Sequence, residues 1–477
     1  MFTSSNILLT NIKPALELLA RSRNLACVCL LVASTTNPVW SQLVPPSSPD
    51  KLPGGSVLSG KSPLAPSPLA PGQGAATPSN SKLSPEERQE RLRAKQQADA
   101  KAEEFRMTTY GILSPTDETP LAVAFRKASD DFRNAIADYT LAHVKIQHRL
   151  KDTLPEGARE NWLEQLQRSN QALRSYREAA ANLFVSDPEK YSGIGLLLRE
   201  MLITDGKSDR LDHWTVPAKV LLDTKTLVTD EVLLYAGYAG LIEGDFDLVK
   251  QTWVPLESSQ KLGQQESILL SRLDEIKQSW EKELQRRQED QTKSNPQVRV
   301  LTTKGEIVVE LFEDDAPETV ANFMYLVEQG YYTRKPFFFV KEHLLAQTGC
   351  EKGDGKGNAG YGVKPEAELA SRRSHFRGAL AMPIGVNTDP AQGSTNFAGS
   401  QFYFTFVPLP LADERNAVFG RVISGIEVLG LLKIVDLTDE EARKDPSLRP
   451  DTIIKTEVIR KRDHDYRPTP VIGRLPR

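Results

Sequence analysis

The sequence has few cysteines. Among 477 residues there are three, Cys27, Cys29 and Cys350. The first two lie in an N-terminal apolar stretch, so we expect only Cys350 to remain in the processed chain. One thiol cannot form an internal disulfide, and it makes neither a CxxC redox pair nor a zinc site. We interpret Cys350 as a partly buried or loop thiol and not as a catalytic nucleophile.

The chain also lacks long apolar runs and an excess of charge of one sign. No apolar run approaches the roughly 20 residues that a membrane-spanning helix needs, which excludes a multispan membrane protein. The 60 Lys and Arg residues nearly balance the 63 Asp and Glu residues. A polybasic nucleic-acid-binding protein is therefore not indicated, and we expect no nucleic-acid partner. The hydrophobic fraction of 39% is slightly low, which indicates that part of the chain is unstructured.

The N-terminus has the pattern of an export signal. Basic residues precede a short apolar core at 25–34, and residues 39–41, Val-Trp-Ser, provide compact side chains for a cleavage site. We therefore expect residues 1–41 to be a signal peptide, the mature chain to start near Gln42 without a membrane span, and the protein to be periplasmic or extracellular. A retained membrane anchor is the alternative, because a long leader precedes the apolar core.

Residues 42–83 are rich in Pro, Ser and Gly, and they show neither a helical nor a strand period. Such a segment cannot bury enough apolar surface to offset the entropy of ordering its backbone. We expect a disordered linker that spaces the folded part from the signal. A proline-rich ligand for a partner is a weaker alternative.

The next region, residues 84–295, predicts an all-α domain. Ser84-Pro85-Glu86-Glu87 is typical of a helix start, and Pro188 and Pro217 are interpreted as breaks. Helical spacing of apolar residues predicts segments at 119–149, 158–183, 188–203, 229–253 and 258–289. The last segment repeats near a period of 3.5, which fits either a short coiled coil or, more commonly, packing against other helices.

One segment of this region, YAGYAGLIEGDFDLV at 235–249, predicts two closely packed helices. Its small residues allow a close approach, and Gly-Asp-Phe makes a tight turn. The segment partially resembles one tetratricopeptide helix pair, although the usual final Ala is Val249 and no 34-residue period is found. A generic helical domain is the alternative, and either would offer a surface to a protein partner.

From residue 297 the hydrophobic period changes to two. Strands are predicted at 298–301, 306–311 and 452–459, with a helix from Ala316 and a Gly-rich loop at 349–362. We interpret this region as a closed antiparallel β-barrel, because closure leaves no strand edge exposed to aggregation. The whole chain is thus expected to be multidomain, with an all-α domain followed by a barrel.

This region carries four motifs, which in chain order are TTKGEIVVELFEDDAPETVANFMYLVEQGYY, AQTG with the glycine-rich stretch after it, GSQFYF, and VFGRVISGIEVL. Together they resemble the cyclophilin family of peptidyl-prolyl isomerases. They follow the family's order and spacing over residues 296–463, about a third of the chain, and leave 464–477 as a tail. The resemblance implies an eight-stranded barrel with two capping helices.

The resemblance also implies an activity, the cis–trans isomerisation of X–Pro bonds in client proteins. The barrier to this rotation is about 18–20 kcal/mol. No bond is made or broken, so no metal, cofactor or covalent nucleophile is needed. Catalysis requires that the twisted amide be held better than either planar form. An apolar pocket holds the proline ring, and polar donors hold the neighbouring carbonyls.

The family's site residues carry over position by position. Gln347 falls on the glutamine that orients the peptide, Gln401 on a second polar contact, and Tyr403 on the aromatic floor of the proline pocket. Phe339 occupies the position of the catalytic arginine. The other positions that the resemblance assigns to substrate binding are Leu344, Leu345, Met382, Leu411 and Asn416.

Leu344 and Leu345 stand where the family usually has Phe-Met, and three other departures matter more. Phe339 can neither donate a hydrogen bond nor carry charge. Asn416 replaces a histidine, and Leu411 replaces the tryptophan associated with cyclosporin binding. Loss of one preorganised charged donor often lowers a rate on the order of 10²–10³-fold. The cations that could substitute for the arginine are Arg334, Lys341 and Arg377.

Two hypotheses follow. The first is an isomerase of reduced activity that assists the folding of exported proteins. The second is a cyclophilin-shaped peptide-binding or scaffold module with little or no turnover. On a regular strand Phe339 would share a face with Phe337, which we expect in the core, so only an altered local geometry or a shared pocket face lets Phe339 line the site. The loop from Met382 to Ser400 is longer than in the family, and we expect it over or beside the pocket.

Overall fold

The computed structural model describes residues 113, 116–147, 157–224, 227–367, 372–387 and 395–475. The predicted signal peptide, the predicted linker and the helix start at Ser84 lie outside the described residues. Within the described part, no helix is both long and apolar enough to cross a membrane.

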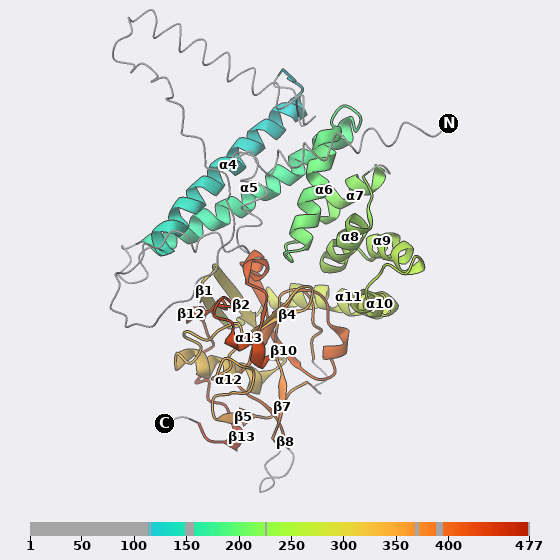
Figure 1. The fold of residues 1–477 in the computed structure, drawn as a ribbon. Coiled ribbons are helices and arrows are strands. Elements are labelled where there is room, and N and C mark those ends of the chain that lie inside the picture. The colour runs from blue at the N-terminus through green and yellow to red at the C-terminus, as the bar shows by residue number, and fades with distance from the viewer. Residues whose placement is uncertain are drawn as a thin grey trace, which may run out of the picture. The chain divides into compact units, whose positions relative to one another are not determined.

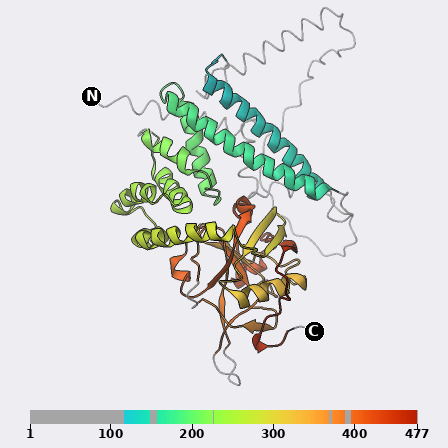
Figure 2. The same ribbon diagram turned by 180° about the vertical axis from the view of Figure 1, so that it is seen from behind.

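The first half of the described chain is helical. The helix α4 (Pro120–Gln147) and the helix α5 (Ala158–Ser186) lie side by side in both ribbon views (Figures 1 and 2). Phe125 and Phe132, about two turns apart on α4, both stack on Tyr176 of α5, with ring centroids 5.3 and 5.5 Å away. The chain continues with α6 (Ser192–Gly206), α7 (Thr215–Asp223), α8 (Asp230–Glu243), α9 (Phe246–Ser258), α10 (Gln264–Ser271) and α11 (Leu273–Asp290).

Two helix predictions were wrong. Pro217, interpreted as a break, is the third residue of α7. Its missing N–H has little effect there, because the first N–H groups of a helix have no intrahelical acceptor. The single helix predicted at 258–289 is two helices, α10 and α11. They are separated at Arg272, whose N–H lies 3.2 Å from the carbonyl oxygens of both Ile268 and Leu269.

The close helix pair predicted at 235–249 is confirmed as α8 and α9. Gly244 has φ = 81° and ends α8, and the Asp245 side chain accepts a hydrogen bond from Leu248 N, which caps α9. A Cβ on Gly237 would lie 1.9 Å from Nε1 of Trp253. Only a residue without a side chain therefore allows this packing. The tetratricopeptide resemblance stays a prediction.

The second half contains two antiparallel sheets. The larger has the order β11-β3-β4-β9-β6-β10-β2-β1-β12, and the smaller has the order β13-β5-β8-β7. The strands of the larger sheet are β1 (Gln297–Thr302), β2 (Glu306–Leu311), β3 (Phe339–Lys341), β4 (Leu345–Thr348), β6 (Ala379–Met382), β9 (Phe402–Thr405), β10 (Ala417–Ser424), β11 (Val435–Asp436) and β12 (Ile453–Arg460). Those of the smaller are β5 (Tyr361–Val363), β7 (Ile384–Asn387), β8 (Thr395–Ala398) and β13 (Pro470–Gly473).

The expected closed barrel is corrected to a curled antiparallel sheet that stays open. Its end strands β11 and β12 are not paired with each other in the strand order. One isolated β-bridge, between Pro336 and Thr452, lies just before β3 and β12. It is the only bridge outside the named strands among the described residues. Proline has no N–H to donate, so this bridge lacks one hydrogen bond of a regular ladder. Hydrogen bonds from Arg334 N to Ile453 O and from Phe337 N to Asp451 O flank the bridge.

One helix packs against the buried face of the larger sheet. The helix α12 (Pro317–Glu328) contributes Phe323, whose ring lies 5.2 Å from Phe402 and 5.3 Å from Phe419. The expected second capping helix is instead the 3-10 helix η4 (Ile426–Leu431), followed later by the short α13 (Glu440–Lys444).

The long loop from Met382 to Ser400 contains the hairpin of β7 and β8, and the residues at its tip lie outside the described ones.

We expect Gly237→Ala to destabilise the fold by about 1–3 kcal/mol, because the added methyl group overlaps the Trp253 ring and the helices must separate. Chemical denaturation of the full chain measures this change. Gln171→Ala, at an exposed position of α5, is the control and should stay within about 0.5 kcal/mol of the parent. Equal midpoints for the parent and Gly237→Ala would contradict the close packing.

Candidate functional site

A row of paired residues crosses the larger sheet. Phe339 of β3 pairs with Gln347 of β4, Gln347 pairs with Tyr403 of β9, and Tyr403 pairs with Ala381 of β6. Residues directly opposite each other on antiparallel strands project from the same face. Three predicted site residues, Phe339, Gln347 and Tyr403, therefore share one face of the sheet. The core that α12 covers lies on the other face.

The conflict between Phe337 and Phe339 is resolved by where β3 begins. Phe337 is fully buried in the main core and donates its N–H to Asp451 O at 2.9 Å. The strand starts at Phe339, which is half-buried and opposite Gln347. The alternation of a regular strand does not apply across this start. Altered local geometry thus lets Phe337 fill the core while Phe339 faces the site.

The two predicted glutamines contact each other. Nε2 of Gln401 donates to the carbonyl oxygens of Gly355 and Gly357, both at 2.8 Å. Carbonyls only accept, so this pair of bonds fixes the orientation of the Gln401 amide. Its Oε1 then accepts from Nε2 of Gln347 at 2.8 Å. Gln347 therefore presents an oriented amide, with one further N–H, on the face of the sheet that carries Phe339 and Tyr403.

A chain of hydrogen bonds leads away from Tyr403. Asn416 Nδ2 donates to the Tyr403 hydroxyl at 2.9 Å, and His375 Nε2 lies 2.9 Å from the same oxygen. His375 Nδ1 lies 2.5 Å from Asp413 Oδ1. In the neutral tautomer that carries its proton on Nδ1, the carboxylate accepts from Nδ1–H and Nε2 accepts from the tyrosine hydroxyl. Burial raises the pKa of Tyr403, which keeps this hydroxyl a donor.

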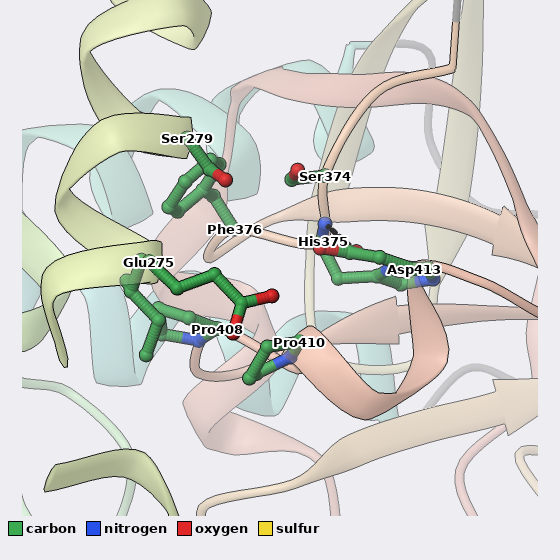
Figure 3. A pocket seen from close by; sticks show the side chains of 9 residues that line it. Glu275, Ser279, Ser374, His375, Phe376, Pro408, Pro410 and Asp413 are labelled. Atoms are coloured by element: carbon green, nitrogen blue, oxygen red, sulfur yellow. Dashed lines mark hydrogen bonds and ion pairs between the residues drawn. The ribbon is translucent and has the colours of Figure 1, made fainter. Parts of the chain in front are cut away.

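Sequence reasoning missed His375 and Asp413. Figure 3 shows these two residues together in a pocket whose lining includes Pro410 and also Glu275 and Ser279 of α11. They are 38 residues apart and belong to no motif. Nothing in a single sequence pairs them, because only the fold brings both beside the β9 strand.

The other expected site residues divide between the two faces. Leu345 packs against the cluster of Tyr403, Ala381 and Val418 on the site face. Leu344 is half-buried in the turn before β4. Met382 is placed differently from its expected pocket position, because it is buried in the main core, with its sulfur 3.7 Å from Asn322 Nδ2.

Two of the substituted positions lie near the end of β9. Leu411 is on the 3-10 helix η3 (Pro410–Ala412) and is 56% exposed. Asn416, besides its bond to Tyr403, accepts a hydrogen bond from Ile384 N at 3.2 Å. Asn416 thus connects the floor residue Tyr403 to the first residue of β7.

Of the three cations considered as substitutes for the arginine, one is on the site face. Arg377 is buried and binds Asp212 with two bonds of 2.8 and 2.7 Å, so it is fully engaged elsewhere. Arg334 is exposed beside β12. Lys341 is exposed, lies two residues beyond Phe339 on β3 and pairs with Leu345. Lys341 therefore shares the face of Phe339, one pair of residues away.

The structure also tests the interpretation of Cys350 as a partly buried or loop thiol. Cys350 is fully buried, and its sulfur accepts a hydrogen bond from Gly357 N at 3.2 Å. Among the described residues, no group of three His, Cys, Asp or Glu side chains is arranged to hold a metal ion.

The C-terminal third of the chain is similar to several known proteins. The model of the family described as cyclophilin type peptidyl-prolyl cis-trans isomerase/CLD matches residues 297–458. A peptidyl-prolyl cis-trans isomerase of Helicobacter pylori is 36% identical over 29% of this chain and 82% of its own length. A peptidyl-prolyl cis-trans isomerase-like 1 of Neurospora crassa is 34% identical over 35% of this chain and 96% of its own. A solved cyclophilin type isomerase of Cryptosporidium parvum is 26% identical over 35% of this chain and 99% of its own, with a TM-score of 0.28.

The match to the family model includes α12 and the row of Phe339, Gln347 and Tyr403. The chain covers most of the length of the two sequence relatives, so the resemblance predicted from the four motifs is confirmed. The chain belongs to the family of cyclophilin-type peptidyl-prolyl cis-trans isomerases.

Proposed function

We propose that this protein is a prolyl isomerase of reduced activity that acts on proline-containing segments of exported client proteins. The observation that carries the proposal is the oriented pair of Gln347 and Gln401, on the sheet face that also holds Phe339 and Tyr403. Three hydrogen bonds orient this pair of amides before a peptide arrives, two made by Gln401 to backbone carbonyls and one from Gln347 to Gln401. Such preorganisation favours the twisted state over the planar ones.

Each group on this face has a role in the proposed reaction. The remaining N–H of Gln347 donates to a peptide carbonyl next to the twisting bond. The Tyr403 ring and Leu345 supply the apolar contact for the proline ring. Removing water from the bond destabilises the planar, resonance-polarised amide relative to the twisted one. No bond is made or broken, so proton transfer is not required.

Phe339 is the reason to expect reduced activity. It stands opposite Gln347, where a charged donor would otherwise contribute on the order of 10²–10³ to the rate. Arg377 is held by Asp212, and Lys341 is one residue pair further along the sheet. The second candidate, a peptide-binding module without turnover, is favoured by this same absence of a cation opposite Gln347.

Export is part of the proposal and is supported by the basic and apolar pattern of residues 1–41 and by the Pro-, Ser- and Gly-rich segment at 42–83. A chain built this way would carry its isomerase domain and its helical domain on a spacer outside the cytoplasm. The helical domain would then be available to a protein partner.

We expect Gln347→Ala in the full chain to lower the acceleration of X–Pro exchange about 10²-fold, because the oriented donor is lost. NMR exchange spectroscopy on a short X–Pro peptide measures this rate. Gln329→Ala, at an exposed glutamine after α12, is the matched control and should keep the parent's rate. Exchange that is unaffected by Gln347→Ala would exclude the proposed role. Peptide binding by a parent chain that accelerates nothing would identify the binding module.

Phe339→Arg should raise the exchange rate, because a cation then stands beside Gln347. Phe339 also pairs with Asp436 of β11, so part of the new charge would be neutralised by that carboxylate. We therefore expect a gain of about tenfold for Phe339→Arg and a larger gain with Asp436→Asn added. Phe339→Leu, which adds no charge, should give no gain. Equal rates for all these variants would show that the position does not face the amide.

Export predicts a mature chain that begins near Gln42. Expression with the native N-terminus in a bacterium that has an export pathway, followed by intact mass measurement of the periplasmic fraction, tests this. An uncleaved chain in the membrane fraction would indicate the anchor instead, and an uncleaved chain in the cytoplasm would contradict export.

A further inference from the structure

The turn between β3 and β4 connects the two strands that carry Phe339 and Gln347. It ends at Leu344, which precedes Leu345 of β4, and the family resemblance assigns both leucines to substrate binding. His343 within it has φ = 54°, a left-handed conformation that residues other than glycine rarely adopt. A residue keeps such a conformation only when its surroundings hold it there. The side chains that do so here come from the helical region.

Asp209, between α6 and α7, supplies the first restraint. Its two carboxylate oxygens lie 3.1 and 3.0 Å from the backbone N of His343, which donates to them. His343 Nδ1 is 2.8 Å from the same carboxylate. Asp209 is only 3% exposed, so water does not replace these contacts easily. A buried acceptor of this kind is costly to leave without its donor.

Two other helical side chains complete the restraint on His343. Tyr238 of α8 stacks on its imidazole ring, with centroids 4.3 Å apart and planes inclined by 21°. Gln265 of α10 donates from Nε2 to the carbonyl oxygen of His343. The backbone N–H, the backbone carbonyl and the ring of one turn residue are thus each held by a different helical side chain.

The segment that carries Asp209 is itself bound to the sheet. Arg377 precedes β6 and donates to the Asp209 carbonyl at 2.6 Å and to the Asp212 carboxylate. It also donates to Phe406 O at 3.0 Å, and Phe406 N in turn donates to Leu344 O at 3.0 Å. Together with the backbone, these hydrogen bonds form a closed ring. It runs from Asp209 through Arg377 and Phe406 to the β3–β4 turn, called the pocket turn below, and back to Asp209.

We propose that Asp209 is a positioning residue for proline recognition, which holds the β3–β4 turn so that Leu344 and Leu345 line the pocket. The helical region is then a working part of the isomerase and not a separate module. This inference rests on the proposed function, because it takes those two leucines as part of the proline pocket. Asp209 itself contacts no substrate in this role.

The test uses the full chain and a short X–Pro peptide. Asp209→Ala should raise KM about tenfold, while kcat changes little, because the Gln347–Gln401 pair is not part of the ring of bonds. Asp209→Asn keeps one acceptor oxygen and should raise KM only about threefold. Asn170→Ala is the matched control. It removes another hydrogen bond from the helical region to the sheet domain, the 2.9 Å bond to Glu427, away from the turn. It should leave KM unchanged.

A second readout does not depend on peptide. The His343 amide should exchange its hydrogen slowly in the parent, about tenfold or more faster in Asp209→Ala, and with a smaller increase in Asp209→Asn. An unchanged KM in Asp209→Ala, an equal rise in Asn170→Ala, or unaltered exchange at His343 would overturn the inference and leave the proposed function standing. A parent chain that neither binds nor isomerises the peptide would instead overturn the proposed function, and the inference with it.

Discussion

The register of four antiparallel strands is the constraint on which the site depends. The pairs Phe339–Gln347, Gln347–Tyr403 and Tyr403–Ala381 form one row across β3, β4, β9 and β6. Side chains alternate between the two faces, so a shift of one residue would move the whole row into the core. The buried residues Val340, Ala346 and Phe404 of the opposite face resist such a shift, because each would have to move out of the core. Core packing and site geometry are therefore one constraint.

A buried ionic cluster joins α11, the last helix before the sheets, to the sheet domain. Arg373 is 2% exposed, forms two bonds of 2.8 Å to Asp290 of α11 and one of 2.6 Å to Asp315, and its guanidinium lies 3.6 Å from the Phe312 ring centroid. Burying these charges carries a desolvation cost, so their main contribution is a defined arrangement rather than large stabilisation. Phe312 also belongs to the cluster around Tyr403. The end of the helical region thus contacts the apolar cluster on the site face of the sheet.

Local patterns predicted the helices and strands well, and the failures have physical causes. Pro217 was interpreted as a break because its position within a helix cannot be known before the helix start is known. The sheet was expected to close because motifs indicate strands but not how the two end strands pair, and β11 and β12 are not paired with each other. His375 and Asp413 were missed because a hydrogen bond between distant residues leaves no local pattern. Gln347 and Gln401, which short motifs singled out, lie within hydrogen-bond distance of each other.

The contact between the helical region and the pocket turn has a consequence through thermodynamic linkage. If docking of the helices on the turn strengthens peptide binding, peptide binding must strengthen docking by the same factor. A tenfold effect corresponds to about 1.4 kcal/mol in both directions. A client segment bound in the groove would then stabilise the docking of the helical region on the turn. A partner bound to the helices would likewise change the affinity for the client without contacting it.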